Sequence, residues 1–311
     1  MGDNTKIEWT DASWTPLRAR HKETKKTGWH CEKVSAGCDN CYSATFNQDR
    51  FGTGLPFKPG HRKDIDIFLD ESMLMQPLRW KRPRRIFVCS MTDLFGDFHI
   101  DEWIDMVFAV MALCPQHTFQ ILTKRSRRMR ELLTSPEFWV QVDSWAVFFV
   151  TMIFTDAGLK HWGHLDFSDL RLPNVHLGVS CEDQTRADER IPDLLATPAA
   201  VRFVSAEPLL GPIDVAWALS RNRLEIVSGF LKSGQFSPGM ETLRPLDQII
   251  VGGESGSGFR PMQMEWAEAI MRQCRDAGTA FFFKQDSGPR SSMRGRASDE
   301  LWSMKQMPVQ A

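Results

Sequence analysis

Short, almost continuously apolar runs recur along the chain from residue 85 onward. They are rich in β-branched and aromatic residues, as expected of strands that are covered on both faces. With an early strand near Trp9, we expect about seven strands, a number that suits a barrel with most of its strands present. The six later runs are Arg85–Ser90, Thr118–Thr123, Val175–Ser180, Val201–Ser205, Gln248–Gly253 and Ala280–Lys284.

Amphipathic helices are predicted between these runs. One begins at Asp101 and repeats its apolar residues on a single face, and another covers 265–277 and ends at Gly278. Alternating strands and helices with right-handed crossovers favour a parallel sheet. The predicted fold class is therefore α/β, a partial or near-complete (β/α) TIM-type barrel with insertions.

Two stretches interrupt this alternation. Residues 135–172 are long and aromatic, and residues 216–246 contain Gly, Ser and Pro with weak patterning. A chain of 311 residues suits one large barrel or two ordinary domains. We expect a single barrel domain over 1–311, with both stretches inserted into it as lids.

Composition excludes some classes of protein. The formal net charge is -1, so no global basic field attracts nucleic acid, and the basic runs at 79–85 and 124–128 are typical of solvated faces. The longest apolar run, 145–154, is about half the length that a membrane span needs. Because the N-terminus is polar and the seven cysteines are odd in number, we expect a cytoplasmic protein with reduced thiols and no membrane contact.

Polar residues follow the predicted strands. In a parallel α/β fold the carboxyl ends of the strands meet at one face, where active sites lie. Acids there suit an amino group or ribose hydroxyls, and a lysine or Arg125 suits a carboxylate. The alternative is that these residues are ordinary loop caps. The residues include Ser90, Asp93, Lys124, Ser180, Glu182, Glu207 and Glu254.

Three cysteines, Cys31, Cys38 and Cys41, form a C-x6-C-x2-C motif. Thiolates bind soft metals, so zinc and an iron–sulfur cluster are the candidates. A structural zinc site needs a fourth ligand, which His30, Cys89 or Cys181 would have to supply. Three thiols suit a cluster with one open iron, and the polar strand ends favour this reading because they need something to act on. Tyr42, the single tyrosine, follows the motif and packs either against the cofactor or into the core.

Several motifs together resemble a phage-associated three-Cys-motif family of unknown function, which is also found in bacterial chromosomes. That family is regarded as radical-SAM-like, and its cysteine loop is similar to that of the spore photoproduct lyase group. The resemblance extends from about Trp9 to about Gln285. The motifs are Gly37–Tyr42, Pro83–Phe95, Phe203–Gly211 and Val251–Gly256.

The resemblance implies a partial TIM-type barrel with a [4Fe-4S] cluster on the three motif cysteines and S-adenosyl-L-methionine on the open iron. By position, Ser90 and Asp93 would bind the methionine amino group and Lys124 would face its carboxylate. Ser180 and Glu182 would lie near the ribose.

We therefore expect a radical S-adenosylmethionine enzyme that cleaves its cofactor to a deoxyadenosyl radical, with an external electron donor and room for a partner protein. A nucleic acid or nucleotide is the expected substrate. One alternative is a zinc-stabilised nucleic-acid-binding module without catalysis. Another is a barrel hydrolase that uses Glu182, Glu207 or Glu254 as general acid or base, with structural cysteines.

Overall fold

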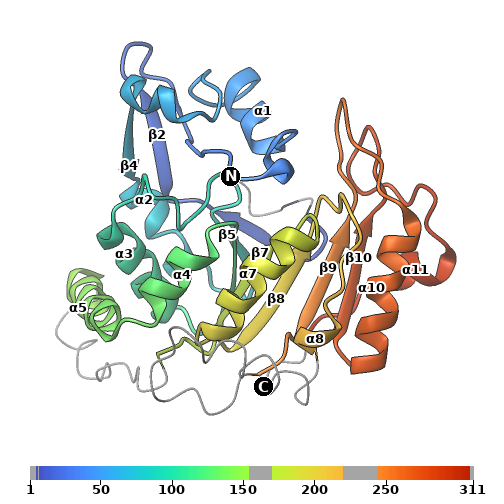
Figure 1. Cartoon of the computed structure of the whole chain (residues 1–311). Coiled ribbons are helices and arrows are strands. Elements are labelled where there is room, and N and C mark those ends of the chain that lie inside the picture. The colour runs from blue at the N-terminus through green and yellow to red at the C-terminus, as the bar shows by residue number, and fades with distance from the viewer. Residues whose placement is uncertain (1–4, 6, 154–169, 220–243, 309–311) are drawn as a thin grey trace. The chain divides into compact units, whose positions relative to one another are not determined.

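The computed structural model describes residue 5 and residues 7–153, 170–219 and 244–308 (Figure 1). The chain divides into two compact units. Unit 1 comprises residues 1–34, 41–176 and 198–200, and unit 2 comprises residues 35–40, 177–197 and 201–311.

The main sheet has seven strands, which follow one another in the order β1-β5-β6-β7-β8-β9-β10. The pairs β1–β5, β5–β6, β8–β9 and β9–β10 are parallel. All six predicted runs are confirmed as strands, and the early strand lies at Ala12–Trp14, just after Trp9. Because β1 and β10 are edges, the sheet is open, which is a partial and not a full barrel. The strands are β1 (Ala12–Trp14), β5 (Arg85–Val88), β6 (Thr118–Thr123), β7 (Val175–Ser180), β8 (Val201–Ala206), β9 (Gln248–Gly252) and β10 (Ala280–Gln285).

The central strands are buried throughout, which explains their continuous hydrophobicity. Every residue of β7, β8 and β9 is buried. Packing is close enough that a Cβ at Gly178 would lie 2.4 Å from Cζ of Phe203 on β8. A glycine is therefore required at this point of β7.

Unit 1 covers its strands with α3 (Asp101–Ala112), α4 (Ser126–Leu133) and α5 (Pro136–Ile153). Phe108 of α3 contacts Phe138 and Trp139 of α5 at ring-centroid distances of 5.2 and 5.9 Å. The first part of the expected insertion at 135–172 is thus a helix packed on α3, and 154–169 lies outside the described residues. No helix in the described part of the chain combines the length and apolar character of a membrane span.

Unit 1 also contains a small antiparallel sheet, β3-β2-β4, which the sequence patterns did not predict. Charged residues alternate along it, and guanidinium groups lie over aromatic rings, as with Arg20 over Phe68 at 4.9 Å. Its elements are β2 (Leu17–His21), β3 (Thr27–Gly28) and β4 (Ile65–Leu69), with α1 (Tyr42–Asp49), α2 (Glu71–Leu74) and the 3-10 helices η2 (Pro59–Asp64) and η3 (Pro77–Arg79) nearby in sequence.

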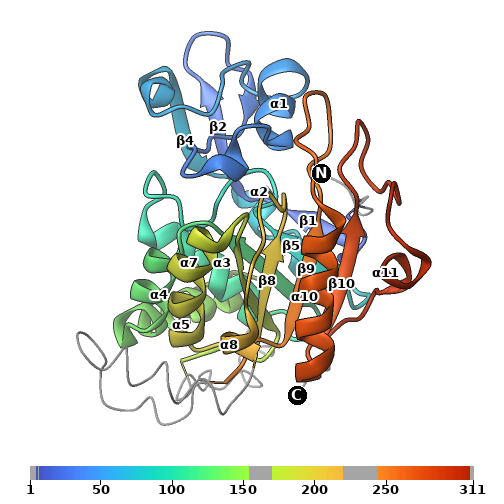
Figure 2. The same cartoon turned by 45° about the vertical axis from the view of Figure 1, so that its right-hand side comes forward.

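Unit 2 contains the 3-10 helix η1 (Ala36–Cys38) and the helices α7 (Gln184–Ala196), α8 (Ala216–Leu219), α10 (Met264–Ala277) and α11 (Asp299–Ser303). Helix α10 runs beside β10 (Figure 2). It ends at Gly278, whose φ of 70° is the left-handed conformation expected of a glycine cap. Of the expected insertion at 216–246, α8 and residues 244–246 are described and 220–243 lie outside the described residues.

Candidate functional site

The three motif cysteines differ from the other four in exposure. Cys31, Cys38 and Cys41 are partly exposed and form no disulfide. Cys31 and Cys41 belong to unit 1, whereas Cys38 ends η1 in unit 2. The motif cysteines are therefore accessible to a soft metal, whereas burial shields the thiols of the remainder. Those buried cysteines are Cys89, Cys114, Cys181 and Cys274.

Cys41 is the residue at the N-terminal end of α1, where the first backbone N–H groups lack helical partners. Its Sγ lies 3.0 Å from Oγ of Ser43. Cys31 packs instead against an apolar cluster of Trp29, Phe57 and Met91. The two unit 1 thiols thus stand in different surroundings, one at a helix end and one at an apolar wall.

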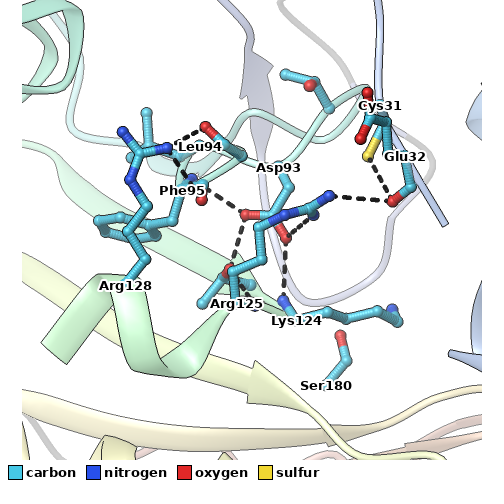
Figure 3. A network of polar contacts seen from close by, with 12 residues as sticks. Cys31, Glu32, Asp93, Leu94, Phe95, Lys124, Arg125, Arg128 and Ser180 are labelled. Atoms are coloured by element: carbon cyan, nitrogen blue, oxygen red, sulfur yellow. Dashed lines mark hydrogen bonds and ion pairs between the residues drawn. The ribbon is translucent and has the colours of Figure 1, made fainter. Parts of the chain in front are cut away.

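In unit 1, the carboxylate of Asp93, in the loop that follows β5, connects several neighbouring groups (Figure 3). Asp93 accepts hydrogen bonds from Oγ1 of Thr123 at 2.7 Å, from the backbone N–H of Lys124 at 3.0 Å and from Nη1 of Arg125 at 3.1 Å. Nη2 of Arg125 donates to the backbone carbonyl of Glu32 at 3.1 Å. We call this connection the Asp93–Arg125 relay; it holds the residue next to Cys31.

This arrangement places the residues expected to bind the amino acid part of the cofactor. Both carboxylate oxygens of buried Asp93 accept hydrogen bonds from protein groups. Lys124 contributes its backbone N–H to this network, and its side chain is partly exposed. The carbonyl of Ser90 accepts a hydrogen bond from Oη of Tyr42 at 2.6 Å. Tyr42 is exposed, so the alternative that it packs into the core is wrong.

A second group of polar residues lies around Glu32, the residue next to Cys31. Glu32 receives hydrogen bonds from Arg62, which lower the pKa of its carboxyl group, and it lies 3.1 Å from Nε2 of His30. Burial lowers the pKa of His30. The guanidinium groups of Arg62 and Arg125 both lie over the ring of Phe98. Sequence reasoning missed Glu32, Arg62 and Phe98, although Glu32 directly follows a motif cysteine.

A comparable connection organises unit 2. Glu254, after β9, is hydrogen-bonded by the guanidinium and backbone N–H of Arg260 and by Nδ2 of Asn40 at 2.9 Å. Nη2 of Arg260 also donates to the carbonyl of Ala36 at 2.9 Å, and Nη1 lies 3.5 Å from Asp39. We call this the Glu254–Arg260 relay. It holds both sides of Cys38.

Neighbouring hydrogen-bond donors keep the carboxyl group of Glu254 ionised. Burial alone would raise the pKa of its carboxyl group, but hydrogen bonds from Arg260 and Asn40 outweigh burial and lower it. The pKa of Arg260 is raised, chiefly by its hydrogen bond to Glu254. The relay is therefore an ion pair at neutral pH.

Glu182, after β7, holds the same segment at another point. Its Oε1 accepts the backbone N–H of Gly37 at 3.2 Å, and its Oε2 pairs with Nη1 of Arg190 at 3.0 Å. Arg190 also donates to the carbonyl of Ser180 at 2.7 Å. A Cβ at Gly37 would lie 3.2 Å from Cδ of Glu182, so a glycine lets the backbone approach the carboxylate.

Glu207 and Lys284 form an ion pair at the ends of β8 and β10, with 2.5 Å between Oε1 and Nζ. They flank β9, which ends in Gly252. A Cβ at that glycine would lie 3.1 Å from Cδ of Glu207. The absence of a side chain there leaves room for the pair to form.

The strand-end residues are thus brought into networks within each unit. Asp93 and Lys124 meet in unit 1, and Glu182 and Glu254 hold neighbouring parts of residues 35–40 in unit 2. Glu207 pairs separately with Lys284. Across residues 7–153, 170–219 and 244–308, no three His, Cys, Asp or Glu side chains are grouped so as to hold a metal ion.

Comparison with known proteins gives one match. The model of the family described as Protein of unknown function (DUF5131) matches residues 4–301, nearly the whole chain, so the protein belongs to this family. No curated protein and no solved structure matches the chain.

Proposed function

We propose that this member of the DUF5131 family is an iron–sulfur enzyme of the radical S-adenosylmethionine type, with a [4Fe-4S] cluster on Cys31, Cys38 and Cys41. The observation that carries the proposal is the contrast among the cysteines. Three partly exposed cysteines that form no disulfide lie within eleven residues, and the other four are buried. Three soft thiolates on a short segment are the ligands of a cluster that has one iron open to a second ligand. The three side chains are not grouped in the described part of the chain, so binding of the cluster would draw residues 31–41 together.

The relays support this proposal because they hold the backbone beside the thiols. Arg125 binds the carbonyl of Glu32, next to Cys31, and Arg260 binds the carbonyl of Ala36, two residues before Cys38. Ligand geometry is set by such surrounding hydrogen bonds as much as by the ligands.

When bound, the cluster would supply the electron that cleaves the carbon–sulfur bond of S-adenosylmethionine. The protein's own residues would orient the cofactor at the strand ends. Lys124 and the Glu207–Lys284 pair offer partly exposed charged groups for this purpose. Asp93, Glu182 and Glu254 act instead as positioning residues, because protein donors occupy their carboxylates.

Burial of one candidate fourth ligand favours a cluster over a four-ligand zinc site. The thiol of Cys89 is buried, which raises its pKa and disfavours the thiolate that zinc needs. A hydrolase using Glu254 as general acid is disfavoured because the pKa of Glu254 is lowered.

The test is to purify single variants without oxygen and measure the iron bound per chain. Cys31→Ala, Cys38→Ala and Cys41→Ala should each lose most of the iron, while Cys274→Ala, a matched buried cysteine, should retain it. An absorption spectrum of each variant reports the cluster itself. Equal loss in all four variants, or retention in all four, would remove the three-thiol assignment.

A further inference from the structure

Helix α1 has the reverse of the usual distribution of polar and apolar residues. It buries two polar residues, Ser43 and Asn47, and exposes the aromatic residues Tyr42 and Phe46. Phe51, two residues after the helix, is 73% exposed. A helix on a protein surface normally buries its apolar face, so these aromatic side chains are not explained by folding.

The buried polar face has a structural role that accounts for its half of the pattern. Asn47 accepts the backbone N–H groups of Trp29 and Thr53 and donates to Oγ1 of Thr53 and the carbonyl of Leu55. All four hydrogen-bonding capacities of this side chain are used. The helix is thus fixed by polar contacts, and its aromatic face is left toward solvent.

The exposed rings are arranged as a platform. Phe46 and Phe51 have ring centroids 6.3 Å apart with 34° between their planes, and the guanidinium of Arg50 lies over Phe46 at 5.0 Å. We call Tyr42, Phe46, Arg50 and Phe51 the aromatic platform. A cation on aromatic rings suits stacking of bases and pairing with phosphates.

The part of unit 1 that contains the platform carries the sign of charge that nucleic acid requires. Residues 17–34 and 41–69, which make up the small sheet of unit 1 and α1, contain ten Lys or Arg and five Asp or Glu, a net charge of +5. The whole chain has a net charge of -1. Basic residues at exposed positions in this region include Arg20, Lys22, Lys25, Lys26, Lys33 and Lys58.

We propose that the aromatic platform binds a single-stranded nucleic acid, with bases stacked on Phe46 and Phe51 and phosphates held by Arg50 and other basic residues of residues 17–34 and 41–69. A single strand is favoured over a duplex because stacking on side chains needs bases that are not stacked on each other. The platform begins at the residue after Cys41. The inference rests on this surface and does not require the proposed cofactor chemistry.

The experiment is a fluorescence anisotropy titration of the full-length protein with labelled oligonucleotides of about twelve nucleotides, a length within the usual range for such surfaces. One is DNA, one is RNA, and one is a DNA duplex. We expect either single strand to bind at least about tenfold more tightly than the duplex, with affinity that falls as salt rises. Binding of DNA or of RNA identifies which nucleic acid is preferred.

Variants locate the binding surface. Phe46→Ala combined with Phe51→Ala should weaken binding by at least about tenfold, and Phe51→Trp should retain it. Phe148→Ala is the matched control, since Phe148 is 48% exposed on α5 in the same unit. Equal effects of the double variant and the control, or preference for the duplex, would overturn the proposal. A dimer that the double variant dissociates, with no binding to either single strand, would also overturn it in favour of self-association.

The iron content of the same preparation separates this proposal from the proposed function. An iron-free protein that binds a single strand through Phe46 and Phe51 refutes the cluster and supports the platform. An iron-containing protein without such binding does the reverse.

Discussion

The two relays contain the same kinds of group in very different surroundings. In unit 1 the side chain of Arg125 is 11% exposed and that of Asp93 is 9% exposed. In unit 2 the side chain of Arg260 is 33% exposed, although its partner Glu254 is buried. Each arginine connects a strand-end carboxylate to a backbone carbonyl of residues 31–41.

Similar hydrogen-bond geometry can therefore stabilise the fold in one unit and hold a backbone segment in place in the other. A buried ion pair that loses one partner leaves a charge without compensation in a medium of low polarity. Arg260 is partly exposed, so its removal lets water approach the carboxylate of Glu254, to which Asn40 still donates a hydrogen bond, and the loss of folding free energy is smaller. We therefore expect the Asp93–Arg125 relay to support the fold of unit 1, and the Glu254–Arg260 relay mainly to order the segment that contains Cys38.

The largest expected effect is that of Arg125→Met. This change leaves the carboxylate of Asp93 buried without its cation and should lower the free energy of unfolding by about 3–5 kcal/mol. Urea denaturation followed by circular dichroism measures the loss. Arg127→Met is the matched control, because Arg127 is 80% exposed and pairs with Glu131 on the same helix. Its loss should stay below about 0.5 kcal/mol, and similar losses in both variants would contradict the comparison.

Asp105 on α3 is a buried carboxylate whose pKa is raised, so we expect its ionisation to destabilise the fold. Burial in α3, together with Asp101 and Glu102, raises the pKa of Asp105 to about 7. Between its ordinary value of 3.8 and about 7, the native state holds the proton and the unfolded state releases it. The free energy of unfolding is therefore highest below about pH 4, where Asp105 is protonated in both states. It falls by up to about 4 kcal/mol as the pH rises toward 7.

Asp105→Asn removes this titration. The variant should be more stable than the wild type at pH 8, and its free energy of unfolding should vary less between pH 4 and 7. Denaturation at a series of pH values measures both effects. A variant that is less stable than the wild type at every pH would show that the ionised carboxylate is stabilised in the fold, contrary to this account.

Arg260→Gln tests the relay whose arginine is partly exposed. We expect a loss of unfolding free energy of about 1–3 kcal/mol, smaller than that of Arg125→Met because water can approach Glu254 at this site. We also expect faster hydrogen exchange of the backbone amides in residues 35–40, because the carbonyl of Ala36 loses its donor. Arg272→Gln, an exposed arginine on α10 that lies 4.0 Å from Glu268, is the control. Unchanged exchange in Arg260→Gln would show that the relay does not order the segment.

The smallest effect is expected for Tyr42→Phe. The variant loses one hydroxyl donor to the carbonyl of Ser90, at an exposed position, and should be destabilised by about 0.5–1 kcal/mol. Thermal unfolding measures the shift. A loss of several kcal/mol would instead indicate that Tyr42 supports the core.

The sequence predicts the parallel strands well because burial on both faces produces long apolar runs, as in β9. It does not predict β2, because Arg18 and Arg20 lie on aromatic rings and interrupt any apolar pattern. The strand is recognised only once the structure shows the guanidinium groups lying over these rings.

For the site, the sequence places acids at the strand ends but not their partners. Arg260 reaches Glu254 because the chain turns back through Gly256 and Gly258, both of which have positive φ. The turn depends on backbone conformation, which the spacing of charged residues does not encode. The pairing of Glu182 with Arg190 was missed for a related reason, since it connects a loop residue to α7.

The central claim is that Cys31, Cys38 and Cys41 hold an iron–sulfur cluster. The most direct measurement is iron and zinc analysis of the full-length protein purified without oxygen. The account predicts about four irons per chain, with little zinc. A colourless protein that contains about one zinc per chain and no iron would contradict it.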